Sequence, residues 1–213
     1  MTHHVAPSDI NSIDLYKILI STVMPRPIAW VSTVSKDGID NLAPFSFFTV
    51  ASVKPPILCF APALKSVDGT PTEKDTLRNI RQTGEFVVNI VSRNLVEKMN
   101  QTSFDYAPHE SEFDAVGLTR APASIVKAKR VAESMVNYEC KLVQIIDFGK
   151  EVQSGSLILG EIVMTHLDER IFKNGKIDMA ELNPVGRLGG LWYSGINDRF
   201  ELKRPAKNKQ NTD

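Results

Sequence analysis

The chain has 213 residues, of which 42% are hydrophobic and 23% are charged. This composition is that of an ordinary globular protein, and it excludes a wholly disordered, collagenous or coiled-coil chain. Lys plus Arg and Asp plus Glu number 25 each, so the formal net charge is zero. Proteins that bind nucleic acid carry a basic excess on one face, and we therefore expect no nucleic-acid partner.

The sequence carries no recognisable targeting or membrane signal. The first residues lack the basic and then apolar pattern of a secretory signal. No apolar run approaches the roughly 20 residues that span a bilayer, so we expect a cytoplasmic protein that does not bind a membrane. Cys59 and Cys140 lie far apart in apolar surroundings, which favours free, buried thiols over a disulfide framework.

The first part of the chain predicts strands that are interrupted by prolines. Residues 25–27, Pro-Arg-Pro, favour an extended segment, because proline restricts its own φ and the conformation of the residue before it. A strand is predicted over 28–34, and an Asp-Gly hairpin turn follows it. In the returning segment, residues 40–50, Pro44 is compatible only with an edge strand, a bulge or a loop.

The middle of the chain predicts a strand and then a helix. The strand covers residues 57–61 and follows a pair of prolines. Thr72 and the three residues after it match a capping box, which predicts a helix that begins near Thr72 and ends at Gly84. Between them, residues 61–70 predict a loop.

Strands dominate the rest of the sequence, so the predicted fold is mainly β, a barrel or a sandwich with a few short peripheral helices. The further elements predicted are a strand buried on both faces over 86–91, a helix from Ser92 or Asn94 through Met99, a long loop over 101–117, strands over 133–146 and 156–164, and a hairpin with an Asn-Gly turn over 172–177.

One domain is predicted, because no linker, repeat or low-complexity segment divides the chain. It covers residues 14–200. Residues 1–13 form a lead-in, and residues 201–213 form a basic tail that we expect to be flexible.

Several common kinds of catalytic site are absent from the sequence. No GxGxxG opens a helix after a strand, and neither a P-loop nor a GxSxG nucleophile motif is present. The four histidines are too scattered to indicate a metal site. Any chemistry is therefore expected to come from a bound organic cofactor.

An anion site is one interpretation of the helix that begins near Thr72. Its first turn offers free N–H groups and the positive end of the helix dipole. Lys74 adds a charge and Thr76 a hydroxyl, so a phosphate could bind there. The alternative is a surface helix with an ordinary cap.

A site for a flat polar ring is one interpretation of residues 41–49. Small, hydroxylic and aromatic residues alternate around Pro44, and an irregular strand leaves backbone N–H and C=O groups free to contact a ring edge. The alternative is an edge strand whose phenylalanines pack in the core.

Taken together and in this order, these segments resemble the flavin reductase family with an FMN-binding split β-barrel of Greek-key topology. The resemblance extends over about residues 14–195. It rests on residues 26–33, 41–48, 54–56, 74–80, 84–89, 111–119, 139–140, 160–163 and 187–190. The segment 61–70 is longer than in many relatives, which leaves the choice between FMN and FAD open at the phosphate end.

The resemblance implies a homodimer that binds FMN, with FAD the less favoured flavin, in a groove near the subunit interface. It also implies a set of cofactor-binding residues: Arg26, Pro27, Phe45, Ser46, Phe47, Phe48, Lys74, Thr76, Asn89, Arg187 and Tyr193. His166 is implied near the nicotinamide as a catalytic residue. The alternatives are a structural histidine, a strand-capping role for Asn89 and a surface ion pair for Arg187.

The function implied is that of an NAD(P)H:flavin oxidoreductase whose reduced flavin serves a partner oxygenase or another electron acceptor. The alternative is a flavoredoxin-like electron carrier without NAD(P)H activity, because one fold can serve several functions. A third possibility is an interaction module that binds no cofactor.

Overall fold

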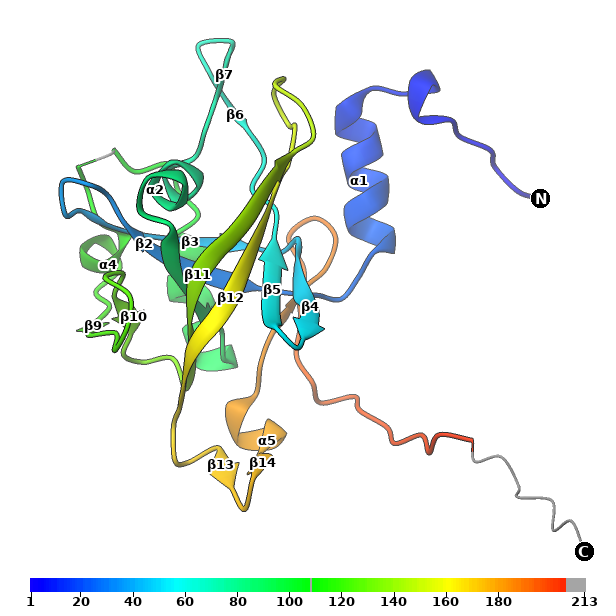
Figure 1. The fold of residues 1–213 in the computed structure, drawn as a ribbon. Helices are drawn as coiled ribbons and strands as arrows, with labels where there is room; N and C mark the ends of the chain where they lie inside the picture. The colour runs from blue at the N-terminus through cyan, green and yellow to red at the C-terminus, as the bar shows by residue number, and fades with distance from the viewer. Residues whose placement is uncertain (108, 206–213) are drawn as a thin grey trace, which may run out of the picture.

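The computed structural model describes residues 1–107 and 109–205 (Figure 1). Its main element is one antiparallel sheet of seven strands in the order β3-β2-β8-β11-β12-β5-β4. These strands are β2 (Ala29–Val34), β3 (Asp40–Phe45), β4 (Phe48–Val53), β5 (Pro56–Phe60), β8 (Glu85–Ile90), β11 (Val136–Asp147) and β12 (Ser156–Leu167).

Short helices and paired segments surround this sheet. The helices are η1 (Pro7–Asp9), α1 (Ser12–Thr22), α2 (Asp75–Thr83), η2 (Arg93–Leu95), α3 (Val96–Gln101), α4 (Glu112–Ala115) and α5 (Met179–Leu182). The short strands are β1 (Arg26–Pro27) with β15 (Gly186–Arg187) and β16 (Tyr193–Ser194), β6 (Lys65–Val67) with β7 (Thr70–Thr72), β9 (Arg120–Ala121) with β10 (Arg130–Val131), and β13 (Phe172–Lys173) with β14 (Lys176–Ile177). The prediction of a mainly β fold with few short helices is confirmed.

The seven-stranded sheet is not closed into a complete barrel. In the described part of the chain, β3 and β4 are its two edges and share no ladder, although only two residues separate them. Of the edge strand, bulge or loop predicted at Pro44, the structure shows the edge strand. The outer edge of β3 is free of strand pairing, which leaves room for side chains of other elements along it.

The core occupies both faces of the sheet, as the apolar strand at 86–91 predicted. Trp30 packs in one cluster with Phe113 and Met99 on one face, whereas Phe86 packs with Phe60 on the other. The Phe60 and Phe86 rings lie 5.5 Å apart edge to face, a favourable arrangement for aromatic pairs.

Helix α2 packs its apolar face on the sheet and ends where the sequence predicted. Leu77 and Ile80 are almost fully buried, and Gly84 terminates the helix with φ 70°, a conformation that glycine adopts without strain. The predicted start was wrong, because Thr72 lies in β7 and its hydroxyl donates to the Thr70 carbonyl. Lys74 is the N-cap, and no side chain caps the helix.

Three segments contain structure that the sequence did not predict. The N-terminal apolar residues form α1, which begins at Ser12, inside the proposed lead-in. The predicted loop before α2 contains the β6–β7 hairpin, which projects beyond the sheet (Figure 1). The predicted loop 101–117 contains α4. The first and last described segments of the chain extend from the same side of the molecule (Figure 1), and the predicted basic tail lies outside the described residues from position 206 onward.

None of the helices in the described ranges has the length and apolar character needed to cross a lipid bilayer.

A buried carboxylate fixes the loop that crosses the sheet between β9 and β10. The Glu139 side chain is fully buried and accepts the backbone N–H groups of Ser124, Ile125 and Val126 at 2.6, 2.7 and 3.0 Å. Its Oε1 also lies 2.5 Å from Nε2 of His166. Burial would raise the pKa of Glu139, but these hydrogen bonds outweigh it and lower the pKa to about 2.

We predict that Glu139→Gln lowers the free energy of unfolding by about 2–4 kcal/mol at neutral pH, because an amide group would face backbone donors. The native pKa lies below the unfolded value of 4.5, so the carboxylate stabilises the fold fully above that value and progressively less as the pH falls toward 2. Chemical denaturation at several pH values measures the difference.

The exposed strand residue Glu161 is the matched control, and Glu161→Gln should change stability little. An equal loss for Glu139→Gln at neutral pH and near pH 2 would contradict the role of the charge.

Candidate functional site

The N-terminus of α2 combines unsatisfied backbone donors with a cation. The first turn of a helix has N–H groups without intrahelical acceptors, and here no side chain caps them. The Lys74 ammonium lies 5.9 Å from the centre of the Phe45 ring and forms no ion pair with any described residue. Burial lowers the pKa of Lys74, and the charge of Asp105 partly opposes this. An anion at this position would pair with the Lys74 ammonium and accept hydrogen bonds from the free N–H groups of the first turn.

Asn41 joins α2 and α4 to the edge strand β3. Its Oδ1 accepts the Thr76 hydroxyl at 2.9 Å, and its Nδ2 donates to Glu112 Oε1 at 2.7 Å. The other oxygen of Glu112 accepts the backbone N–H of Leu42 at 2.8 Å. Burial raises the pKa of Glu112, and these donors lower it in part. The network fixes the start of α2 relative to β3.

A groove runs from the start of α2 along the free edge of β3. We call its two parts the anion compartment, with a volume of ≈ 60 Å³, and the ring compartment, with a volume of ≈ 250 Å³. Pro44 and Ser103 line both, so the two compartments adjoin each other. The anion compartment is lined by Asn41, Lys65, Lys74, Thr76, Asp105 and Glu112, among others. The ring compartment is lined by Tyr16, Ile28, Ser46, Met99, Arg187 and Tyr193, among others.

Arg26 stands behind the ring compartment and holds α1 in place. Its Nη1 donates to the carbonyls of Ile20 and Val23 at 2.6 and 2.7 Å, at the C-terminal end of α1. Its Nη2 donates to Leu188 at 3.0 Å, and its Nε donates to the Ser46 hydroxyl at 3.4 Å. A cation at a helix C-terminus is favourable. Because Ser46 accepts from Arg26, its own proton is free to be donated into the groove.

Of the residues predicted to bind a cofactor, five line the groove: Ser46, Lys74, Thr76, Arg187 and Tyr193. Thr76 differs from the expectation, because its hydroxyl proton goes to Asn41 and its backbone N–H remains as the donor. The Arg187 guanidinium stacks on Tyr193 at 4.5 Å instead of forming a surface ion pair, and Tyr193 donates its hydroxyl to Asn100 at 3.0 Å.

The three predicted phenylalanines do not line the groove. Phe45 is buried in the core and packs 5.2 Å from Phe60, and Phe48 is packed against the same cluster. Phe47 is exposed beneath the Arg26 guanidinium. For Phe45 and Phe48 the alternative of core packing therefore describes the structure, because apolar rings gain more from burial than from an open groove.

Three further predicted residues lie elsewhere. Asn89 is fully buried and bonds to Trp30, Val131 and Asn137, so it has no group left for a ligand and does not cap a strand end. Pro27 is exposed in β1. His166 lies in β12, four strands from β3 in the sheet order, and its Nε2 contacts the buried Glu139 carboxylate, so the structure does not bring it to the groove.

The groove residues that the sequence interpretation did not name as cofactor-binding include Tyr16, Asn41, Lys65 and Glu112. Asn41 and Glu112 stood inside segments that carried the family resemblance, but their contact joins positions 71 residues apart. No local pattern indicates such a pairing. The capping-box pattern predicted a helix start near Thr72, and Lys65 fell within the loop predicted before it.

The groove has the form of a binding site for a planar molecule with an anionic end. Comparison with known proteins agrees with a site of this kind. Residues 20–183 match the family described as "flavin reductase like domain". The chain therefore belongs to the flavin reductase-like family, an oxidoreductase family whose members bind a flavin.

Three solved structures are similar to this chain. Nitrilotriacetate monooxygenase component B from Bacillus cereus has a TM-score of 0.88 and 31% identity, with 95% of this chain and 99% of that chain covered. The 2-nitrobenzoate 2-nitroreductase NbaA of Pseudomonas fluorescens has a TM-score of 0.85 and 32% identity, with 96% and 98% covered. A protein with a split barrel domain from Shewanella frigidimarina has a TM-score of 0.80 and 25% identity, with 96% and 100% covered.

Proposed function

We propose that this protein is an NAD(P)H:flavin oxidoreductase that binds FMN in the groove beside β3. The observation that carries the proposal is that the two compartments adjoin each other, one beside the uncapped start of α2 and the other beside Ser46. A second candidate, a flavin-binding electron carrier, uses the same groove and is separated from the enzyme by its lack of reaction with reduced nicotinamide.

The residues present fit a phosphorylated flavin. A phosphate would meet the N–H groups of the first α2 turn and the Lys74 ammonium, which has no ion-pair partner among residues 1–107 and 109–205. A flat ring would lie in the compartment between Pro44 and Tyr193. A bound flavin supplies the chemistry, because it accepts hydride from a reduced nicotinamide.

The chain's own task is to orient the ring and to keep one side of it dry. Ser46 can donate a hydrogen bond to the ring edge while Arg26 holds its oxygen. Arg187, stacked on Tyr193, places positive charge beside the ring compartment, where it would stabilise electron density gained on reduction. No acid from this chain is required in the groove, so His166 has no catalytic role in the proposal.

The acceptor of the electrons is proposed from the similar structures. One of these is component B of a monooxygenase, which supports delivery of reduced flavin to an oxygenase. Another is a nitroreductase, which supports reduction of a small oxidant at the bound flavin itself. Both outcomes require the same groove and the same first step.

Lys74→Met tests the anion compartment. We expect the Kd for FMN to rise about 10- to 100-fold, since a charge-assisted contact contributes roughly 1.5–3 kcal/mol, and the Kd for riboflavin to stay unchanged. Because burial lowers the pKa of Lys74, wild-type FMN affinity should fall on the alkaline side before an ordinary lysine would titrate. Isothermal titration calorimetry measures both ligands.

Lys141→Met removes an exposed strand lysine and serves as the control. Equal weakening of FMN and riboflavin by Lys74→Met would show that the phosphate does not bind at the start of α2.

Anaerobic mixing of the FMN-loaded protein with NADH, and separately with NADPH, tests the enzymatic step. We expect the flavin absorption band to bleach with at least one nicotinamide, because the ring compartment is open to solvent on one side. Dithionite provides the fully reduced control. Bleaching by dithionite alone would favour the electron carrier, and a protein that binds no flavin would favour the interaction module.

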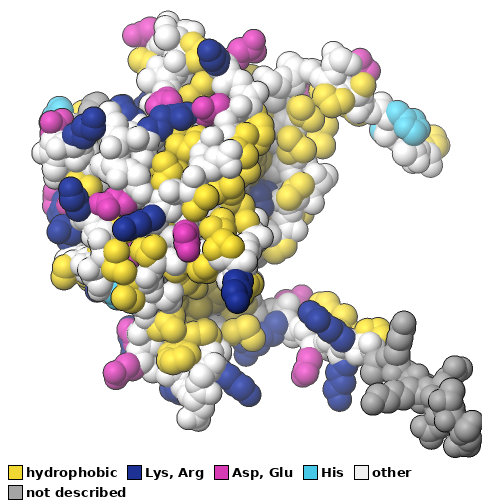
Figure 2. All heavy atoms as spheres, in the orientation of Figure 1, with side chains coloured by type: hydrophobic (Ala, Val, Ile, Leu, Met, Phe, Trp, Pro, Cys, Tyr) yellow, Lys and Arg dark blue, Asp and Glu magenta, His cyan; other side chains and the backbone are white. Residues whose placement is uncertain are grey.

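A homodimer is proposed from the apolar side chains on the face shown in Figure 2. Hydrophobic residues gather there along the sheet beside α1. Val50 and Val53 of the edge strand β4 are 62% and 85% exposed, and Ile13 and Leu19 of α1 are also exposed. An uncovered apolar edge strand invites pairing with another chain, and a second copy would also cover the mouth of the groove.

Light scattering should therefore give a mass of twice 23.7 kDa for the wild type. Val53→Glu should shift it toward the monomer, because a charge would be buried in the interface. Met179→Glu in α5, also exposed in the chain, is the control. A monomeric wild type would contradict the proposal.

A further inference from the structure

We propose that the phosphate end of the groove is closed by a latch between two loops, so that the site accepts a flavin with one terminal phosphate and rejects FAD. The latch consists of the β6–β7 hairpin, the loop of residues 102–106 and the Lys65–Asp105 ion pair that joins them. This inference rests on the proposed function and identifies which flavin its site selects.

The ion pair is part of the compartment wall. Lys65 Nζ lies 2.9 Å from Asp105 Oδ1, and both residues line the anion compartment. The Lys65 side chain is 27% exposed and that of Asp105 is 76% exposed, so the pair spans from the inside of the wall to its outer surface. Phe104 and Tyr106, whose rings lie 5.2 Å apart edge to face, extend the same wall.

The room behind this wall is too small for a nucleotide. The anion compartment has a volume of ≈ 60 Å³, and the hollow next to it, lined by Arg78, Asn79 and Tyr106, has ≈ 20 Å³. On this measure a water molecule needs roughly 10–15 Å³. A phosphate that displaces a few waters can be accommodated, whereas the second phosphate and adenosine of FAD require the hairpin and the loop to separate.

The charges also favour a single phosphate. Lys65 and Lys74 line the compartment, but Asp75 and Asp105 line it as well. The two charges of the latch also act on Lys74. Burial has the largest effect and lowers the pKa of Lys74, whereas the Asp105 carboxylate raises that pKa and the Lys65 ammonium lowers it. A second phosphate directed outward would pass the Asp105 carboxylate, and like charges repel.

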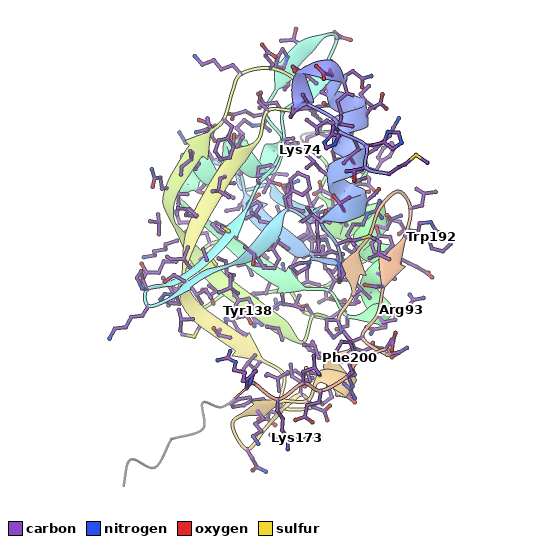
Figure 3. All side chains as sticks on the ribbon, turned by 90° about the vertical axis from the view of Figure 1, so that its right-hand side faces the viewer. Lys74, Arg93, Tyr138, Lys173, Trp192 and Phe200 are labelled. Atoms are coloured by element: carbon purple, nitrogen blue, oxygen red, sulfur yellow. The ribbon has the colours of Figure 1, made fainter. Side chains whose placement is uncertain are left out.

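The latch can be opened without disturbing the core. The β6–β7 hairpin projects beyond the sheet (Figure 1) and its tip residues 66–71 are exposed. An ion pair of this exposure contributes little to folding, and exposed loop tips tolerate shortening. Lys173 lies at the opposite end of the molecule from Lys74 (Figure 3), so its ion pair with Asp178 provides a matched control.

Calorimetric titration with riboflavin, FMN and FAD tests the latch. Two variants open it independently: Asp105→Ala, and a chain in which residues 66–71 are replaced by an Asn-Gly turn. The wild type should bind FMN at least about tenfold more tightly than FAD. Each latch variant should lower the ratio of the FAD Kd to the FMN Kd at least about fivefold, with the affinity for riboflavin, which carries no phosphate, changed less than about threefold. Lys173→Ala should leave all three affinities unchanged.

The outcomes separate this inference from the proposed function. Equal wild-type affinity for FMN and FAD would overturn the latch while leaving flavin binding intact, as would an unchanged FMN-to-FAD ratio in both variants. Failure of the wild type to bind any of the three flavins would overturn the proposed function and the latch with it. Retained affinity for riboflavin, which has no phosphate, shows that each variant is folded.

Discussion

The geometry of the groove depends on the position of helix α2 against strand β3, and the Asn41 side chain fixes that position. Its amide accepts the Thr76 hydroxyl from the first turn of α2 and donates to Glu112 of α4. Glu112 in turn holds the backbone of Leu42 in β3. Three elements therefore meet at one amide, and the backbone donors of α2 are aimed along the edge of the sheet. Buried networks of this kind specify a unique arrangement when every member is satisfied.

The break between β3 and β4 has a structural benefit for binding. A closed barrel would pair the outer edge of β3 and leave no groove along it. Here Ser46 follows β3, where the chain leaves the ladder, and Arg26 holds its hydroxyl from behind. The same guanidinium satisfies the C-terminal carbonyls of α1, so the helix that carries Tyr16 into the ring compartment is tied to the serine. The two sides of the compartment are therefore positioned by one buried side chain.

Elements whose pattern is local could be predicted from the sequence. The turn at Asn174-Gly175 and the end of α2 at Gly84 depend on residues that adopt positive φ, and the buried strand β8 is marked by its apolar run. The start of α2 was misjudged, since Thr72 matches a capping box but is paired in the β6–β7 hairpin. A tertiary or hairpin contact can override a local pattern of this kind.

The predicted binding residues show the same difference between local patterns and tertiary contacts. Lys74 and Ser46, which the sequence singled out and which line the groove, lie next to a helix start and a strand interrupted by a proline, and both features are visible locally. Which face of the strand each phenylalanine occupies was not predictable, because Phe45 is directed into the core by packing with Phe60.

A crystal structure of the protein with FMN would test the central claim most directly. The account predicts that the phosphate contacts Lys74 and the first backbone N–H groups of α2, with the ring between Pro44 and Tyr193. A phosphate directed into solvent, or a ring bound away from β3, would contradict it.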